Sequence, residues 1–299
     1  GNSLSQIEGA IHHGADDNAS GVAAVMEVAH RLGALQAAGD LELKRNIVFG
    51  LWTGEEIGIL GSTHFVKESK DKLIGYINMD MVGRMRDQTL IVQGLGSAKE
   101  WPKLIADMNA GTDALTVKTQ ADPYLPTEPR AFYLKGIPAV SFFTGSHSEY
   151  HTQHDTHEKI NYGGLARVAG KVAALATQIA GPGDARLTYE KVSGPRPMPE
   201  QSPGGARDFR LYLGTIPDYT YEGDPGVKVS GTSKDSPAER AGILAGDRIV
   251  ELGGTKIRNI HDYVYCLQAL KAGEKIRMRV VRDGGEKSLE ITPMLKAQR

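Results

Sequence analysis

Four short segments of the chain carry acidic residues or histidine in an arrangement that could hold metal ions. The segments are residues 14–21, 51–58, 77–83 and 150–156, and they include Asp17, Glu55, Glu56, Asp80 and His151. Two Asp, two Glu and one His form a nearly complete set of ligands for a pair of Zn²⁺ ions. Two neighbouring ions need a bridging carboxylate, ligands of their own and a base beside the bridging water. The residue types therefore indicate a two-metal site that activates water.

Each segment also has a purely structural interpretation when it is taken alone. Asp, Asn and Ser in 14–21 are ordinary helix N-cap residues, and Glu55 and Glu56 could be a surface acidic pair in a turn. One His among the nine of the chain carries little weight by itself. Asp80, in contrast, ends an apolar strand pattern, where an unpaired charge would be costly. The arrival of all these groups at separate strand ends favours the metal interpretation.

Alternating strand and helix patterns up to residue 181 are the elements that must position these groups. Strand-like runs lie at 46–52, 74–79, 90–93, 115–119 and 138–143, and helical patterns at 20–35, 61–70, 100–108 and 165–180. Residues 46–52 lack polar alternation, which predicts a buried central strand. The helix over 20–35 has a wide apolar face that predicts deep packing, formed by Val22, Val25, Met26, Val28, Ala29 and Leu32. The alternation predicts a three-layer α/β/α fold with a mostly parallel central sheet.

The composition excludes several other classes of protein. The 299 residues include 35 Lys+Arg and 36 Asp+Glu, a net charge of −1, which argues against nucleic acid or a membrane surface as the partner. No apolar run approaches the roughly 20 residues of a membrane-spanning helix. The single cysteine, Cys266, excludes a disulfide framework and thiolate metal sites and is expected in a core. Any metal site must use His and carboxylate.

A change of composition divides the chain. Residues 182–207 contain five of the 14 prolines and several glycines, which is typical of a semi-extended linker. Short strand patterns with glycine-containing turns and one helical pattern at 261–270 follow. We therefore expect a first domain over 1–181, a linker over 182–207 and a small β-rich domain over 208–299.

The motifs of the first domain together resemble the dizinc aminopeptidases, which share a fold with glutamate carboxypeptidase and the glutaminyl cyclases. The matching residues are 15–21, 52–62, 77–84, 136–139, 150–152 and 155–156, in the same order as in the family. The resemblance implies two zinc ions per intact catalytic domain and peptides or proteins as substrates. It also implies a periplasmic or secreted bacterial location, although the chain shows no signal peptide.

The resemblance also implies roles for individual residues. Asp17 would bridge the two ions, Glu56 and His151 would complete the ligands of one, and Asp80 would serve the other. Glu55 would be the general base, and Tyr150 would donate a hydrogen bond to the oxyanion, its alternative role being a packing aromatic.

Two departures from the family pattern stand out. The family has a further His ligand in a His-x-Asp segment upstream of the bridging Asp, whereas only 16 residues precede Asp17 and His12 and His13 lie in a different context. We therefore expect the N-terminal part of the catalytic domain, with one metal ligand, to be missing from this chain. Relatives carry Asp-His where this chain has Glu128 and Pro129, so the family's substrate contacts from that loop do not carry over directly.

The second domain resembles a PDZ domain of the kind attached to bacterial envelope proteases, most strongly over 236–257. Such domains accept a peptide as an added strand and hold its C-terminal carboxylate with backbone N–H groups. The predicted carboxylate loop is Tyr212, Leu213, Gly214 and Thr215, with Gly214 allowing close backbone approach. The alternative is a structural appendage with a blocked groove.

The function predicted from the sequence is a metallo-aminopeptidase whose PDZ domain docks the C-terminus of a substrate or partner. The absent His motivates an alternative, a non-catalytic peptide-binding protein on a degenerate peptidase scaffold. A carboxypeptidase or a glutaminyl cyclase on the same fold is a further alternative. The Glu55–Glu56 pair favours the peptidase, because hydrolysis needs both a base and a bridging water.

Overall fold

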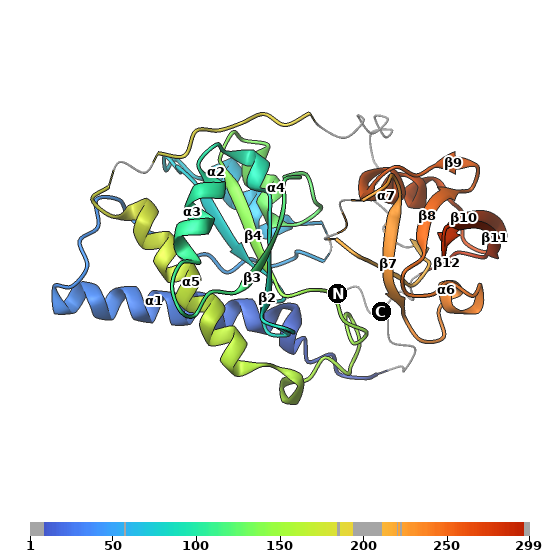
Figure 1. Cartoon of the computed structure of the whole chain (residues 1–299), viewed down its shortest axis with the longest axis horizontal. Coiled ribbons are helices and arrows are strands. Elements are labelled where there is room, and N and C mark those ends of the chain that lie inside the picture. The colour runs from blue at the N-terminus through green and yellow to red at the C-terminus, as the bar shows by residue number, and fades with distance from the viewer. Residues whose placement is uncertain are drawn as a thin grey trace. The chain divides into compact units, whose positions relative to one another are not determined.

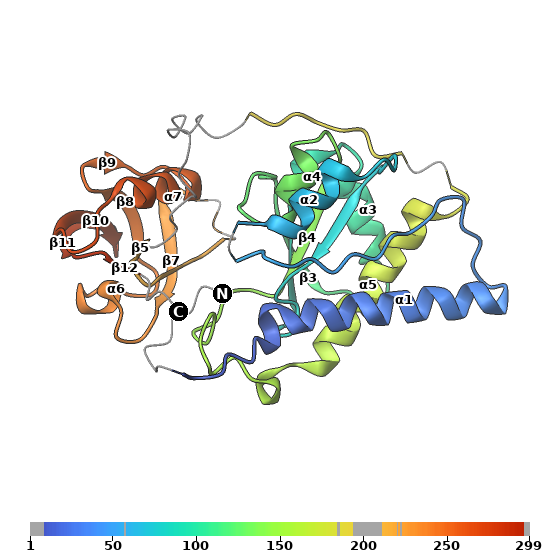
Figure 2. The ribbon, with the colours of Figure 1, turned by 180° about the vertical axis from the view of Figure 1, so that it is seen from behind.

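The computed structural model describes residues 9–56, 58–183, 186–193, 211–219, 221 and 223–295. The chain forms two compact units (Figures 1 and 2). The larger unit holds residues 13–145 and 155–193, and the smaller holds the described residues from 211 onward together with 9–12 and 146–154. No helix in the described ranges is long and apolar enough to cross a membrane.

The larger unit is built on a four-stranded sheet. Its strands are β1 (Tyr76–Met79), β2 (Thr89–Gln93), β3 (Thr116–Gln120) and β4 (Ala139–Phe143), in the order β1-β4-β2-β3. The pairs β1/β4 and β2/β3 are parallel, and β2/β4 is antiparallel. All of β4 is buried, as expected for a strand covered on both faces. The predicted α/β fold with a mostly parallel sheet is confirmed.

Helices cover both faces of this sheet (Figure 1). The helices α1 (Gly21–Ala38), α3 (Trp101–Met108) and α5 (Tyr162–Ala180) share one core with Val140 and Phe142 of β4. The helices α2 (Leu60–Glu68) and α4 (Glu128–Tyr133) form a second core with Ala139. Because successive strand side chains point to opposite faces, β4 serves both cores. Short 3₁₀ turns lie at η2 (Leu95–Ser97) and η3 (His157–Lys159).

Aromatic rings fill the second core. Tyr76 stacks on Phe132 with ring centroids 3.7 Å apart, and Trp52 lies 4.8 Å from Phe65. The indole N–H of Trp52 donates to the hydroxyl of Tyr76 at 3.0 Å. This cluster joins the segment before α2 to β1 and α4.

The apolar face of α1 is narrower than predicted. Ala24, Val28 and Leu32 are buried at helical spacing, whereas Val22 is 40% and Met26 is 63% exposed. The prediction was wrong for this flank because α5 and the sheet contact only one stripe of the helix.

The strand predicted over 46–52 does not form within the described chain. Among the described residues, β1 pairs with β4 and not with residues 46–52. Val48, Phe49 and Leu51 are exposed. A run of β-forming residues becomes a strand only when a neighbouring backbone supplies hydrogen-bond partners. Composition alone does not indicate whether that neighbour is present.

The smaller unit is β-rich. Its elements are β5 (Leu211–Tyr212), β6 (Thr215–Pro217), β7 (Val227–Thr232), α6 (Pro237–Arg240), β8 (Arg248–Leu252), β9 (Thr255–Lys256), α7 (Ile260–Ala269), β10 (Ile276–Arg282), β11 (Gly285–Ile291) and β12 (Met294–Leu295). The main sheet has the order β11-β10-β8-β7-β6 with antiparallel pairing throughout. Val229, Ile249, Leu252 and Met278 centre its core, in which Cys266 is buried.

Candidate metal centre

A cavity of about 970 Å³ in the larger unit has six acidic residues in its lining, and five of them come from the predicted site segments or from the start of α4, the sixth being Asp71. The five are Asp17, Glu55, Glu56, Asp80 and Glu128. Asp80 directly follows β1, Asp17 lies in the turn before α1, and Glu128 opens α4 with only 7% of its surface exposed. Ends of separate elements therefore converge here, as the sequence pattern predicted for this type of fold.

Three of the predicted ligands approach one another closely enough to hold one ion. One ligand atom each of Asp17, Glu56 and His151 lies within 4.8 Å of the other two. His151 is carried by residues 146–154, whose flanking residues on both sides belong to the larger unit. Its ring stacks on Tyr150, with centroids 3.7 Å apart. Asp80 and Glu55 line the cavity but are outside this group of three.

The closely spaced acidic side chains of the cavity favour binding of a cation. Burial, followed by the charges of Asp17, Glu128, Glu55 and Glu56, raises the pKa of Asp80 well above its usual range. Burial and the charges of Asp17 and Glu56 likewise raise the pKa of Glu128. The Oδ1 atom of Asp80 is buried without a hydrogen-bond partner, and such an atom is costly unless something binds it. Carboxylates with one histidine suit Zn²⁺, so these residues fit the metal that the resemblance implies.

The turn that carries Asp17 is hydrogen-bonded to the segment after β1. This turn, η1 (Ala15–Ser20), departs from helical backbone angles at Asp17. An Oδ1 atom of the buried Asp16 accepts a hydrogen bond from the N–H of Gly83 at 2.6 Å. The hydroxyl of Ser20 accepts from the N–H of Val82 at 3.1 Å and donates to the carbonyl of Asp16 at 2.8 Å. The two acidic neighbours therefore differ: Asp16 faces the backbone, and Asp17 faces the cavity.

Asn18 makes a second link between the same elements. Its Nδ2 donates to the carbonyl of Met79 at 3.1 Å, and its Oδ1 accepts from the N–H groups of Gly21 and Met81 at 3.0 and 3.2 Å. The bond to Gly21 is a helix-capping contact. A Cβ atom at Gly21 would overlap Asn18 and the carbonyl of Met79, so the approach requires glycine. The same turn therefore caps α1 through Asn18 and places Asp17 at the cavity.

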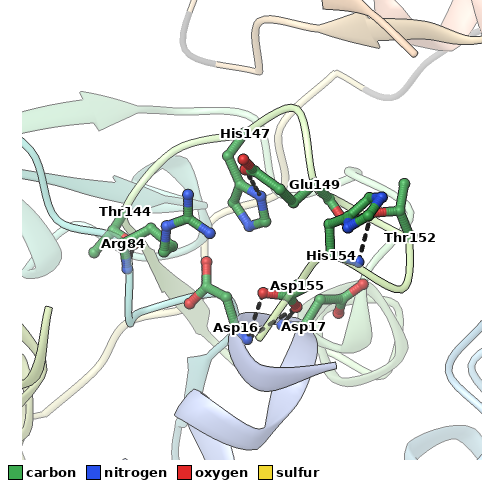
Figure 3. Close-up of polar contacts among 9 residues, drawn as sticks. All are labelled: Asp16, Asp17, Arg84, Thr144, His147, Glu149, Thr152, His154 and Asp155. Atoms are coloured by element: carbon green, nitrogen blue, oxygen red, sulfur yellow. Dashed lines mark hydrogen bonds and ion pairs between the residues drawn. The ribbon is translucent and has the colours of Figure 1, made fainter. Parts of the chain in front are cut away.

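Asp155 holds the other side of the turn. Its Oδ1 and Oδ2 atoms accept from the N–H of Asp16 at 3.1 and 2.9 Å, and Oδ2 also accepts from the N–H of Asp17 at 3.0 Å (Figure 3). Its carbonyl accepts from the N–H of Ala15 at 3.1 Å. Only 1% of Asp155 is exposed.

The segment 146–154 has polar contacts of its own. His147 is almost fully buried, and its Nδ1 lies 3.3 Å from an Oε atom of Glu149 (Figure 3). The Thr152 hydroxyl donates to the carbonyl of Glu149 at 2.7 Å and accepts from the N–H of His154 at 3.2 Å. These short-range bonds shape the turn that contains Tyr150 and His151.

In the smaller unit, the predicted carboxylate loop joins β5 to β6. The carbonyls of Leu213 and Gly214 accept from the N–H groups of Ala238 and Ser233, each at 2.8 Å. Gly214 has φ +80°, and a Cβ atom there would overlap the side chain of Ser236. The backbone at this position therefore requires glycine. The hydroxyl of Thr215 lies 2.6 Å from that of Tyr263 on α7.

Sequence reasoning assigned no function to Asp16, Asp155 or Glu128. Glu128 entered only as a departure from the family pattern, whereas the structure places its side chain in the cavity. Asp155 belonged to a matching motif, but its contacts join residues 139 positions apart. The sequence carried no signal for these contacts, because the burial of Asp155, with 1% exposed, follows from the fold.

The larger unit is an α/β domain with a carboxylate-rich cavity, and comparison with known proteins identifies its family. Residues 3–176 match the Peptidase family M28, and residues 228–282 match a PDZ domain. The chain belongs to Peptidase family M28 and carries a PDZ domain at its C-terminal side.

Individual relatives cover only part of this chain. Leucine aminopeptidase 2 of Arthroderma otae is 28% identical over 200 residues, which are 56% of this chain and 39% of the fungal one. Aminopeptidase NAALADL1 of Mus musculus is 40% identical over 86 residues, 27% of this chain and 11% of the mouse one. The structure of BSAP, a zinc aminopeptidase from Bacillus subtilis, has a TM-score of 0.50 and 23% identity, covering 58% of this chain and 44% of that one. The chain thus matches less than half the length of each of these proteins, and the structural likeness establishes the fold.

Proposed function

We propose that the protein is a zinc-dependent aminopeptidase that removes N-terminal residues from peptides. The observation that carries this proposal is that Asp17, Glu55, Glu56, Asp80 and Glu128 line one cavity, with a buried and unpartnered oxygen on Asp80. Membership of Peptidase family M28 supports a peptidase, and the aminopeptidases among its relatives support N-terminal cleavage. The zinc aminopeptidase of Bacillus subtilis is consistent with zinc as the metal.

In this proposal the residues of the cavity divide into ligands and proton carriers. Asp17, Glu56 and His151 would hold one ion, and Asp17 and Asp80 would be the residues of this chain available to a second. When bound, two zinc ions supply Lewis acidity and a water of lowered pKa. A carboxylate oxygen of Glu55 would accept a proton from the attacking water as its oxygen bonds to the scissile carbonyl carbon, and would deliver that proton to the amine nitrogen as the C–N bond breaks.

The proposal also gives a catalytic role to Tyr150. Its ring is held against that of His151, which places its hydroxyl on the same short segment as a ligand. In the proposal this hydroxyl donates a hydrogen bond to the oxygen of the scissile carbonyl as negative charge develops there.

The test is hydrolysis of a panel of amino-acid p-nitroanilides by the full chain at neutral pH with added Zn²⁺. Glu55→Gln keeps the shape of the side chain but removes the base, so we expect at least a 100-fold lower kcat with unchanged zinc content. Glu68→Gln is the matched control, because Glu68 is exposed at the end of α2. Equal rates for the wild type and Glu55→Gln would refute the assignment.

Metal analysis separates this function from the non-catalytic alternative. About two zinc ions per intact catalytic domain are expected for the two-metal enzyme. A chain that binds no zinc and cleaves no member of the panel would instead support a peptide-binding protein on a peptidase scaffold.

For the smaller unit we propose binding of a peptide C-terminus at Tyr212, Leu213, Gly214 and Thr215. The match to a PDZ domain supports this role, and so does β6, which pairs only with β7 among the described strands. A peptide strand could add to the other edge of β6. Fluorescence anisotropy should show binding of a labelled peptide with a free C-terminal carboxylate and no binding of its C-terminally amidated form.

A further inference from the structure

We infer that Asp155 is a positioning residue for metal binding, which sets the direction of Asp17 without binding the ion itself. This inference rests on the proposed metal site. Three consecutive backbone N–H groups, those of Ala15, Asp16 and Asp17, donate to Asp155, the first to its carbonyl and the other two to its carboxylate. Figure 3 shows the carboxylate of Asp155 against the turn that carries Asp16 and Asp17.

The geometry explains how one side chain can direct another. Successive N–H groups that point the same way form a concave anion site, and here the anion is a carboxylate of the chain itself. The bonds to Asp16 and Asp17 fix the orientation of two successive peptide planes. The Cα atom of Asp17 belongs to the second of these planes and its residue lines the cavity, so the anchoring constrains the direction of its side chain.

The carboxylate of Asp155 binds the backbone and lies outside the group of candidate metal ligands. Both of its carboxylate oxygens accept backbone N–H groups, and it is outside the group formed by Asp17, Glu56 and His151. Its burial, with 1% exposed, excludes water as a competitor for the N–H groups.

The position of Asp155 in the sequence adds a second connection. It follows His151 by four residues, so one short segment supplies both a proposed ligand and the anchor of another. Loss of the anchor should loosen Asp17 relative to the other ligands. Outer residues that orient metal ligands typically contribute 10–100-fold to metal affinity.

The test compares Asp155→Ala and Asp155→Asn in the full chain, with zinc affinity measured by competition with a chromogenic chelator. We expect Asp155→Ala to weaken zinc binding by about 10-fold or more. Asn keeps one acceptor oxygen, which can serve the two N–H groups now bound to Oδ2, so Asp155→Asn should recover part of the affinity. The visible spectrum of the Co²⁺-loaded protein should change in Asp155→Ala, because it reports the arrangement of the ligands.

Ser97→Ala is the matched control for a general loss of stability. Ser97 is fully buried in the same unit, and its hydroxyl bonds to Ala139 and to the indole of Trp101. It does not line the cavity. We expect Ser97→Ala to lower the urea midpoint of the metal-free protein while zinc affinity and the Co²⁺ spectrum stay those of the wild type.

Three outcomes distinguish the interpretations. Weakened zinc binding in Asp155→Ala with normal binding in Ser97→Ala supports the inference. Equal losses of stability in both variants with wild-type zinc affinity in both would overturn it and leave the metal site intact. A wild-type chain that binds neither Zn²⁺ nor Co²⁺ would overturn the metal site and the role of Asp155 together.

Discussion

The side-chain oxygen of Asn18 accepts a hydrogen bond from the backbone N–H of Met81 at 3.2 Å. Met81 is the residue after Asp80, so this bond ties the turn containing Asp17 to the end of β1 that carries Asp80. The two proposed ligands are thereby connected through the backbone next to them. The same amide also donates to the carbonyl of Met79, which prevents the turn from sliding along the strand.

Asn18→Ala should therefore weaken both the fold and metal binding. It removes bonds to three partly buried backbone groups, and we expect a loss of about 2–3 kcal/mol in the free energy of unfolding. Zinc affinity should fall as well. Urea denaturation and chelator competition measure the two effects.

Asn109→Ala is the control for this variant, because Asn109 likewise bridges backbone groups through both of its side-chain atoms, at Leu115. It should lose comparable stability and keep wild-type zinc affinity. Normal zinc affinity in Asn18→Ala would show that the link to Met81 is irrelevant to the metal site.

Replacing Asp80 by Asn should have opposite effects with and without metal. Burial and four neighbouring carboxylates raise the pKa of Asp80, so removal of its charge relieves repulsion and should raise the melting temperature of the metal-free protein. Zinc should stabilise Asp80→Asn less than the wild type, because stabilisation by a ligand follows its affinity. Differential scanning calorimetry with EDTA and with Zn²⁺ checks both signs. A variant that is less stable without metal would contradict the electrostatic argument.

The smaller unit should lose stability in acid through Asp247. Burial alone would raise the pKa of Asp247, but the hydrogen bonds from Arg282 and from the N–H of Leu244, together with the charge of Arg282, lower it below its usual range. A group with a lowered folded-state pKa contributes stability above its unfolded value, about 3.9 for Asp. That contribution disappears as the pH falls from about 4 through the folded-state value.

Asp247→Asn should flatten this dependence on pH. The urea midpoint of the smaller unit can be followed between about pH 2 and 6 through the NMR signals of the buried Ile249. Asp224→Asn is the control, because Asp224 forms an exposed ion pair with Arg248, and such pairs contribute little. An unchanged acid slope in Asp247→Asn would refute the assignment.

Gly214→Ala should damage the smaller unit and its proposed peptide binding. The positive φ of +80° and the overlap with Ser236 both oppose a side chain, so a cost of about 1–3 kcal/mol in unfolding free energy is expected. Gly231→Ala is the control, because a Cβ atom there has open space within the fold. Wild-type stability and peptide binding in Gly214→Ala would exclude the assigned role of this loop.

The sequence predicted which segments meet at the cavity, although among its described acidic residues only Asp80 reaches it from the end of a strand. Asp17, Glu55, Glu56 and Asp80 all line the cavity, and the role of each stays a prediction. The prediction of a strand over 46–52 was wrong. Its apolar residues show a tendency to form a strand, but they do not show whether a neighbouring strand is present to pair with it. The contacts of Asp155 could not be predicted, since they depend on how a loop folds back over a distant turn.

Both tryptophans of the chain, Trp52 and Trp101, lie in the larger unit. Excitation of indole therefore reports that unit alone, and the smaller unit, whose described aromatic residues include tyrosines but no indole, is silent in the same measurement. Trp52 also borders the cavity while its N–H is held by Tyr76. A divalent ion entering the cavity would change the electric field at this indole ring, so the fluorescence of Trp52 should report occupancy of the proposed metal site.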